Sequence, residues 1–168
     1  MIGIRAHTAD DDSAVWQVNK TAFPTPAEAG LVERLRAEAE PVISLVAEDD
    51  SGLVGHILFS PVCLAADSGF PAMGLAPMAV LPDRQRRDIG GAMLRAGLDA
   101  CRGLGCKAVF VLGHPDYYPR FGFVAASRYG IESRFEVPDE AFMVLELEPG
   151  ALEGLAGKMH YHPAFDAL

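Results

Sequence analysis

The sequence predicts a single α/β domain in which strands and helices alternate along the chain. Hydrophobic residues make up 50% of the 168 residues, which suits one compact domain with a sizeable core. Some segments alternate apolar and polar residues or are apolar throughout, whereas others repeat apolar residues at helical spacing. Neither an internal repeat nor a low-complexity linker divides the chain.

The first third of the chain predicts a strand, two helices and a hairpin. Residues 2–7 alternate as a half-buried strand would, and Thr8 and Asp10 then offer N-caps for a helix. After two prolines, residues 27–40 predict a second helix. Two apolar stretches around a Ser-Gly turn predict a hairpin within residues 42–64.

The remainder continues the alternation of strands and helices. A strand is expected at 73–81, and Pro77 inside it predicts a bulge or an interrupted pairing, because proline has no N–H for the ladder. Residues 88–104 predict the clearest helix, with one apolar face formed by Ile89, Ala92, Met93, Ala96, Ala100 and Leu104. Three further segments follow, a buried strand, a short helix with a turn, and a late strand, at 107–113, 115–123 and 141–148.

Charge and cysteine content exclude several classes of protein. The net charge is −9, from 23 acidic and 14 basic residues, so nucleic acids and anionic membranes would be repelled. This charge favours a cationic substrate, although it also serves solubility. The three cysteines indicate free thiols in a reducing cytosol. With no apolar leader or spanning segment, we expect a cytoplasmic protein without a membrane partner.

An arginine- and glycine-rich turn is the most informative motif. In the stretch APMAVLPDRQRRDIGGAMLRAGL (76–98), an apolar strand ends, three arginines follow, and Gly90 and Gly91 open a helix. The first helical turn leaves N–H groups without partners and carries partial positive charge. Glycines let a phosphate approach the backbone, and Arg84, Arg86 and Arg87 supply full charges. The alternative is a solvated basic loop before a glycine-tolerant helix.

The turn differs from the two common nucleotide motifs. It lacks the Gly-Lys-Ser/Thr of a triphosphate loop, and it lacks the G-x-G-x-x-G of a dinucleotide site. No paired cysteine or carboxylate spacing accompanies His160 and His162, so no metal is expected.

The same turn resembles a known family. Residues Arg87-Asp88-Ile89-Gly90-Gly91-Ala92 fit the Q/R-x-x-G-x-G/A signature of the GNAT superfamily of acetyl-CoA-dependent N-acetyltransferases. The strand PMAVLP before the turn and YYPRFGF after the next strand are similar to the family's other two landmarks, and all three occur in the family's order. The resemblance covers about residues 2–148 and implies a mixed, mostly antiparallel central sheet flanked by helices.

The tail at 149–168 is expected to dock on this domain. Its end, GKMHYHPAFDAL, resembles the end of small bacterial members whose substrates are mostly undefined.

The resemblance also implies where acetyl-CoA binds. The pyrophosphate would lie on the N–H groups of the signature residues, namely Arg87, Asp88, Ile89, Gly90, Gly91 and Ala92. The pantetheine arm would pair with the strand backbone at Met78, Ala79 and Val80. Arg84, Arg86 and Arg120 are the candidates for direct contact with the phosphates.

Family members transfer the acetyl group by direct attack of an amine on the thioester. Tyr118 aligns with the tyrosine that protonates the leaving sulfur, with Tyr117 as a rival, and a backbone N–H near Met78 would meet the oxyanion. The strand at 73–81 has no ionisable side chain for a general base. Glu48, His56, His114 and a water chain are the alternatives, and none is assigned.

These observations predict transfer of an acetyl group to a primary amine, with a polyamine, an aminoglycoside-like compound or a lysine side chain as acceptor. The alternative is an acyl-CoA-binding sensor or regulatory module that has lost catalysis, which the missing strand carboxylate favours and Tyr118 opposes. The apolar tail and the late strand offer a surface for a homodimer.

Overall fold

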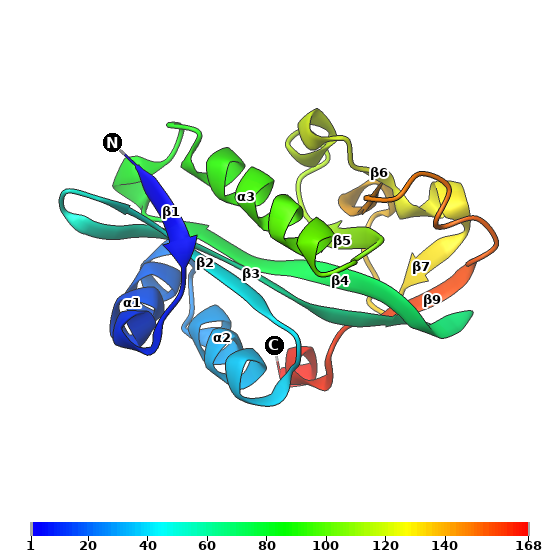
Figure 1. The fold of residues 1–168 in the computed structure, drawn as a ribbon, viewed down its shortest axis with the longest axis horizontal. Coiled ribbons are helices and arrows are strands. Elements are labelled where there is room, and N and C mark those ends of the chain that lie inside the picture. Colours follow the sequence, from blue (N-terminus) through cyan, green and yellow to red (C-terminus); the bar gives the residue numbers. More distant parts are fainter. Residues whose placement is uncertain (1, 168) are drawn as a thin grey trace. The chain divides into compact units, whose positions relative to one another are not determined.

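A computed structural model describes residues 2–167 (Figure 1). Three α-helices are present in these residues, α1 (Asp12–Ala22), α2 (Ala27–Glu38) and α3 (Ile89–Gly103). The strands are β1 (Gly3–Ala6), β2 (Ile43–Asp49), β3 (Gly52–Leu64), β4 (Asp67–Val80), β5 (Ala108–Leu112), β6 (Val124–Ala125), β7 (Ile131–Ser133), β8 (Phe142–Glu146) and β9 (Gly157–His160). Short 3-10 turns connect several of them. No helix in the described chain is long and apolar enough to cross a membrane.

The strands form the mixed, mostly antiparallel sheet that the resemblance implied. The hydrogen-bonded order is β1-β2-β3-β4-β5-β8-β6, and β9 pairs with both β3 and β7. The parallel pairs are β4 with β5 and β7 with β9. The predicted hairpin is β2 and β3, which pair from Ile43–Phe59 to Asp49–Gly52. The short strands β6, β7 and β9 were not expected from the sequence, because two to four residues carry too little periodicity.

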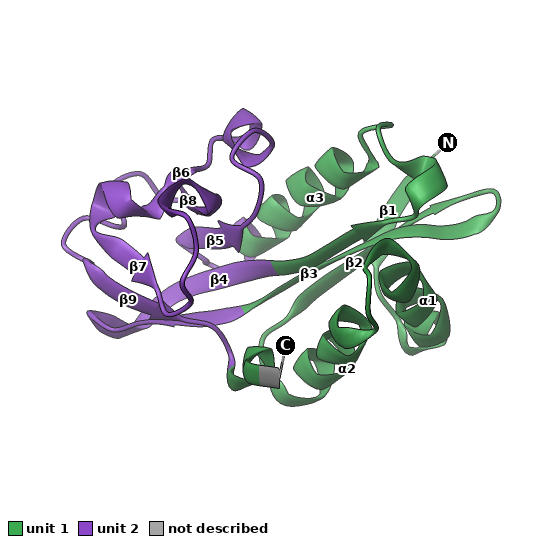
Figure 2. Ribbon diagram, turned by 180° about the vertical axis from the view of Figure 1, so that it is seen from behind, with its two compact units in different colours: residues 1–60, 76–101, 163–168 green, residues 61–75, 102–162 purple. Residues whose placement is uncertain are grey.

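The chain folds as two compact units (Figure 2). The first contains residues 1–60, 76–101 and 163–168, and the second contains residues 61–75 and 102–162. Strands β3 and β4 each contribute residues to both units.

In the first unit, α3 approaches the sheet through two glycines. A Cβ atom on Gly97 would overlap with the ring of Phe59 on β3, and one on Gly55 would press against Met93. The side chains of Phe59 and Met93 are fully buried. A side chain at Gly97 would therefore force the helix away from β3.

The buried face of α3 differs from the predicted one. It consists of Ile89, Gly91, Met93, Leu94, Gly97, Leu98 and Cys101, whereas Ala92, Ala96 and Ala100 are only half-buried. Leu104 was expected on this face but is 55% exposed, because α3 ends at Gly103. The contact of α3 with the sheet is centred on Gly91 and Gly97 rather than on the alanines, because a helix approaches its neighbour most closely at its smallest residues.

Helices α1 and α2 lie on the side of the sheet opposite α3 (Figures 1 and 2). Their apolar faces are buried, with Val15, Val18, Leu31, Val32 and Leu35 at most 3% exposed. The chain enters α1 through a 3-10 turn, Ala9–Asp11, with Thr8 as the N-cap. Asp11 rather than Asp10 completes this cap, because its carboxylate accepts a hydrogen bond from the Thr8 N–H at 2.8 Å.

The second unit is built on β5. The parallel ladder between β4 and β5 runs from Ala72–Ala108 to Leu75–Val111 and ends there, two residues before Pro77. This end agrees with the interruption predicted from the proline. Strand β9 brings the tail into this unit, where Met159 is fully buried and the Tyr161 ring packs against Gly74 of β4.

Replacing Gly97 with alanine should lower the free energy of unfolding by about 1–3 kcal/mol, because the new Cβ overlaps with the buried Phe59 ring. Urea unfolding of the purified variant measures this change.

Gly103→Ala is the matched control. It lies on the same helix, and a Cβ there meets nothing within 4 Å. Its unfolding free energy should stay within about 0.5 kcal/mol of the wild-type value. Equal stability of the two variants would contradict the tight packing of α3 on β3.

Candidate functional site

The arginine- and glycine-rich turn lies in the first unit, between the end of β4 and the start of α3. A 3-10 turn, Pro82–Arg84, follows β4, and α3 begins at Ile89, whose side chain is 3% exposed. Burial of Ile89 anchors the first helical turn, so Gly90 and Gly91 lie within it. The sequence thus places a helix N-terminus where a phosphate site was predicted.

The N–H groups of this turn are not all available to a ligand. The Ala92 N–H donates to the Asp88 carbonyl at 3.0 Å, which is an intrahelical hydrogen bond. Ala92 was predicted to contact the pyrophosphate through its N–H, and this hydrogen bond removes it from the set of free donors. The N–H groups of residues 87–91 precede this bond and remain candidates.

Two residues of the loop adopt a left-handed backbone. Arg86 has φ of 65° and Asp88 has φ of 59°, a region that favours glycine. Each such non-glycine residue costs about 1 kcal/mol. The signature Q/R-x-x-G-x-G/A also matches Gln85-Arg86-Arg87-Asp88-Ile89-Gly90, with Asp88 in place of the first glycine. Asp88 therefore adopts the left-handed backbone conformation that favours glycine, although it has a side chain.

The Asp88 side chain folds over the start of α3. Its Oδ2 accepts a hydrogen bond from Arg95 at 2.6 Å, and its Oδ1 lies where a Cβ of Gly91 would be. A carboxylate at this position interacts favourably with the helix dipole. It also places a negative charge beside the N–H groups that a phosphate would need.

The arginines of the loop have different roles. Arg84 was a candidate for phosphate contact, but it donates to Asp49 at 3.0 Å, Asp83 at 2.8 Å and Ser51 at 3.2 Å. Asp49 and Ser51 hold its guanidinium at the β2–β3 turn, so Arg84 stabilises that turn. Within the described chain, Arg86 and Arg87 are exposed and have no hydrogen bond or ion pair.

Arg120 belongs to the second unit. Its guanidinium lies 4.5 Å from the centre of the Tyr117 ring and donates to the Tyr117 carbonyl at 3.3 Å. These contacts are local to the 3-10 turn Tyr118–Phe121.

The strand residues predicted to meet the pantetheine arm are the last of β4. The ladder with β5 ends at Leu75, so Met78, Ala79 and Val80 lie beyond it. Met78 and Val80 are half-buried, whereas Ala79 is buried. The Val80 carbonyl accepts a hydrogen bond from the Gln85 side chain at 3.2 Å, a contact that sequence reasoning missed.

Tyr118 lies in the second unit and is 8% exposed. Its ring packs against the backbone of Gly113, where a Cβ would overlap with it, and contacts Tyr117 and Phe123 edge to face. Burial raises the pKa of Tyr118 to about 12, so the hydroxyl stays protonated at neutral pH. Neutral phenol is the form required of a proton donor.

Tyr161 is a second buried tyrosine of this unit. Burial raises its pKa, and the neighbouring charge of Tyr118 raises it further. The sequence predicted only that the tail docks on the domain, because no pattern links position 161 with position 118.

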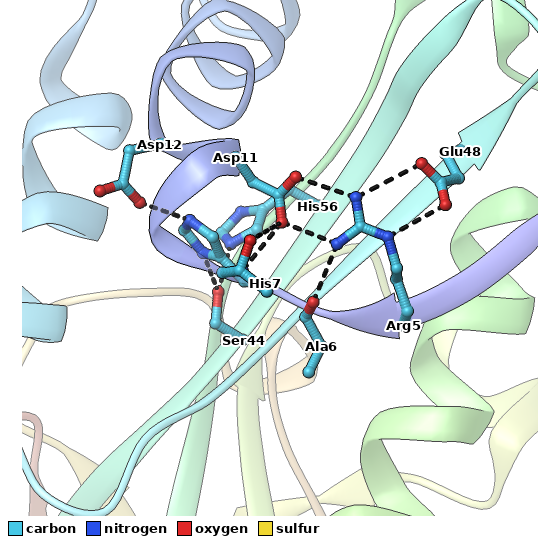
Figure 3. Close-up of polar contacts among 9 residues, drawn as sticks. Arg5, Ala6, His7, Asp11, Asp12, Ser44, Glu48 and His56 are labelled. Atoms are coloured by element: carbon cyan, nitrogen blue, oxygen red, sulfur yellow. Dashed lines mark hydrogen bonds and ion pairs between the residues drawn. The ribbon is translucent and has the colours of Figure 1, made fainter.

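Of the open alternatives for a general base, Glu48 is engaged elsewhere. Arg5 on β1 donates to Glu48 at 3.0 Å and binds both oxygens of Asp11 at 2.8 and 2.9 Å (Figure 3). The arginine thereby joins β1, β2 and the start of α1. His114 is exposed, and its carbonyl accepts from the Tyr117 N–H at 3.1 Å.

His56 belongs to a buried chain of hydrogen bonds. Asn19 Nδ2 lies 3.2 Å from His56 Nδ1, His56 Nε2 lies 2.8 Å from Ser44 Oγ, and Ser44 Oγ lies 2.8 Å from His7 Nδ1. His7 Nε2 ends the chain at Asp12, 2.8 Å away (Figure 3).

The Asn19 NH2 group can only donate, so His56 accepts at Nδ1 and carries its proton on Nε2. His56 then donates to Ser44, Ser44 donates to His7 Nδ1, and His7 donates from Nε2 to Asp12. Both imidazoles are therefore neutral. His56 thus has a structural role, and its two ring nitrogens are occupied.

Two further features bear on ligands. An open groove of about 620 Å³ in the second unit is lined by acidic and basic side chains, among them Glu132, Glu136, Arg134 and Lys158. Among the described residues, no three His, Cys, Asp or Glu side chains come together as a metal site would require.

Comparisons with known proteins show the family of the chain. Residues 3–126 match a family model described as acetyltransferase (GNAT) domain. The uncharacterized N-acetyltransferase YhbS of Escherichia coli K12 is 33% identical over 164 residues, which is 97% of this chain and 98% of YhbS. The uncharacterized N-acetyltransferase YjhQ of the same strain is 40% identical over 134 residues, or 77% of this chain and 74% of YjhQ.

Two crystal structures extend the similarity to the fold. YhbS from Escherichia coli in complex with CoA superposes with a TM-score of 0.92 at 32% identity, covering 98% of this chain and 92% of that one. A GNAT family acetyltransferase from Brucella melitensis in complex with acetyl-CoA superposes with a TM-score of 0.81 at 35% identity, covering 99% of each chain.

Stability should fall as the pH drops from about 7 to about 5.5. Burial, with help from His7 and Arg36, lowers the pKa of His56 to about 3, and burial also lowers that of His7. In this pH window the histidines of the unfolded chain, with a pKa near 6.5, bind protons, whereas the buried imidazoles of the folded chain stay neutral. The loss from His56 is about 1 kcal/mol, and His7 adds to it.

Urea unfolding at the two pH values measures the loss, and NMR titration assigns it. The exposed His114 provides the control, because His114→Gln should leave the loss unchanged. A His56 ring that titrates near pH 6.5 in the folded protein would contradict the hydrogen-bond chain.

Proposed function

Because the chain belongs to the GNAT family of N-acetyltransferases, we propose that it transfers the acetyl group of acetyl-CoA to a primary amine. The observation that carries this proposal is the N-terminus of α3, which exposed arginines precede. The preceding strand, β4, is no longer paired with β5 in its last residues. The complexes of YhbS with CoA and of the Brucella protein with acetyl-CoA support it.

The cofactor site follows from these two elements. The N–H groups of residues 87–91 bind the pyrophosphate, and the free charges of Arg86 and Arg87 assist. The backbone of Met78, Ala79 and Val80 pairs with the pantetheine arm after Gln85 releases the Val80 carbonyl. The N–H near Met78 stabilises the oxyanion.

The chemistry requires one bond to form and one to break. The amine nitrogen attacks the thioester carbon, the tetrahedral oxyanion collapses, and the carbon–sulfur bond breaks. The nitrogen, positively charged after the attack, loses its proton to water, and Tyr118 donates its proton to the leaving sulfur. The Tyr118 phenolate then takes a proton back from water, so the tyrosine is regenerated. A raised pKa does not make Tyr118 a stronger acid, but it keeps the hydroxyl in the form that donates.

The net charge of −9 supports a cationic acceptor such as a polyamine, an aminoglycoside-like compound or a lysine side chain. The mixed charges of the groove in the second unit favour neither sign. A panel of spermidine, an aminoglycoside and a lysine-containing peptide samples the three classes.

Tyr118→Phe should lower kcat about a hundredfold or more and leave the KM for acetyl-CoA nearly unchanged, because the phenol acts only as the sulfur departs. Acetyl-CoA-dependent thiol release with the amine panel measures both constants.

Tyr117→Phe is the matched control, since the two rings are neighbours at 5.1 Å. A strong loss in Tyr117→Phe alone would transfer the role to Tyr117. Binding of acetyl-CoA without turnover of any amine would favour the sensor.

Asp88→Asn should tighten CoA binding about fivefold, because it removes a negative charge beside the N–H groups of α3. Asp88→Gly should act similarly and also relieve the left-handed backbone. Isothermal titration with CoA measures the dissociation constants.

Asp83 offers the control, because it also pairs with an arginine of this loop but precedes α3 by several residues. Asp83→Asn should change the affinity less than about twofold. Unchanged or weaker binding in Asp88→Asn would place the pyrophosphate elsewhere.

A further inference from the structure

A cavity of about 340 Å³ lies between α1 and α2 in the first unit. Its volume falls in the range of small-molecule sites, about 300–1,000 Å³. Val15, Trp16 and Val32 form an apolar wall. Because α1 and α2 lie on the side of the sheet opposite α3, the cavity is separate from the proposed cofactor site (Figures 1 and 2).

Arg36 supplies positive charge to this cavity. It is half-buried and, within residues 2–167, has neither a hydrogen bond nor an ion pair. Its neighbour Arg34 on the same helix does pair, with Glu38 at 3.6 Å. Arg36 and His7 line the same cavity, and the charge of Arg36 lowers the pKa of both His7 and His56. An unpaired guanidinium in a cavity is well suited to bind a carboxylate in a bidentate manner.

Two carboxylates line the same cavity. Asp12 is held by the hydrogen bond from His7 Nε2, yet its side chain is 59% exposed. Glu33 is exposed, and no hydrogen bond or ion pair to another described residue engages it. With His7 neutral, the charged groups that line the cavity are one guanidinium and two carboxylates. The two carboxylates repel a ligand that carries only a negative charge, and a ligand that carries only a positive charge leaves Arg36 without a partner.

We propose that this cavity binds a small zwitterion of the α-amino acid type. The carboxylate of the ligand pairs with Arg36, its ammonium group faces Asp12 and Glu33, and its hydrocarbon side chain lies against Val15, Trp16 and Val32. The neutral His7 positions Asp12 for this contact through the 2.8 Å hydrogen bond. This site is independent of acetyl transfer, and its ligand binds whether or not CoA is present.

The single tryptophan of the chain reports on this cavity directly, because Trp16 lines it. L-leucine added to the full chain should shift Trp16 emission with a saturable, millimolar dissociation constant. L-leucinamide lacks the carboxylate and 4-methylpentanoate lacks the ammonium group, so each should bind about tenfold more weakly. Equal binding of 4-methylpentanoate and L-leucine would overturn the zwitterion assignment.

Two variants separate binding from nonspecific effects. Arg36→Gln should weaken L-leucine about tenfold or more, because the carboxylate loses its partner. Arg34→Gln, two residues away and outside the cavity, should leave binding unchanged, and circular dichroism checks that both variants fold. No saturable change up to about 50 mM L-leucine, or the same response in Arg36→Gln, would overturn the proposal.

Discussion

The contact of α3 with β3 is the constraint on which the candidate site depends. Gly97 and Gly55 remove the side chains that would hold these elements apart, and Phe59 and Met93 fill the space between them. The helix start is fixed by the burial of Ile89, so its unpaired N–H groups have a defined position after β4. The proposed phosphate site depends on this rigidity, because backbone N–H groups cannot adjust as side chains can.

The arginines of the first unit fall into two groups, those paired with carboxylates and those without a partner among the described residues. Arg84 forms an ion pair with Asp49 at the β2–β3 turn. Arg5 forms ion pairs with Asp11 in the α1 cap and with Glu48 on β2. Arg86 and Arg87 precede α3 without partners in the described chain, and Arg36 faces the cavity between α1 and α2. Arginines without a partner are available to an anionic ligand, whereas Arg84 and Arg5 have structural roles.

The sequence was sufficient to predict the helices, the hairpin and the mixed sheet, because long periodic segments and the family signature agree. It placed Leu104 in the core because periodicity does not show that α3 ends at Gly103. It left Arg84 among the phosphate ligands because Asp49 and Ser51 are distant in sequence. The partners of His56 could not be predicted for the same reason, since Asn19 lies on α1 and Ser44 on β2.

The direction of the buried hydrogen-bond chain has an evolutionary consequence. From Asn19 through His56, Ser44 and His7, each group donates to the next, and Asp12 accepts the last hydrogen bond. Replacing His56 or Ser44 therefore leaves a donor and an acceptor unmatched in the buried part of this chain. Single substitutions are therefore selected against even where each new side chain would fit. In diverging relatives, these five positions should be inherited together or replaced together by apolar residues.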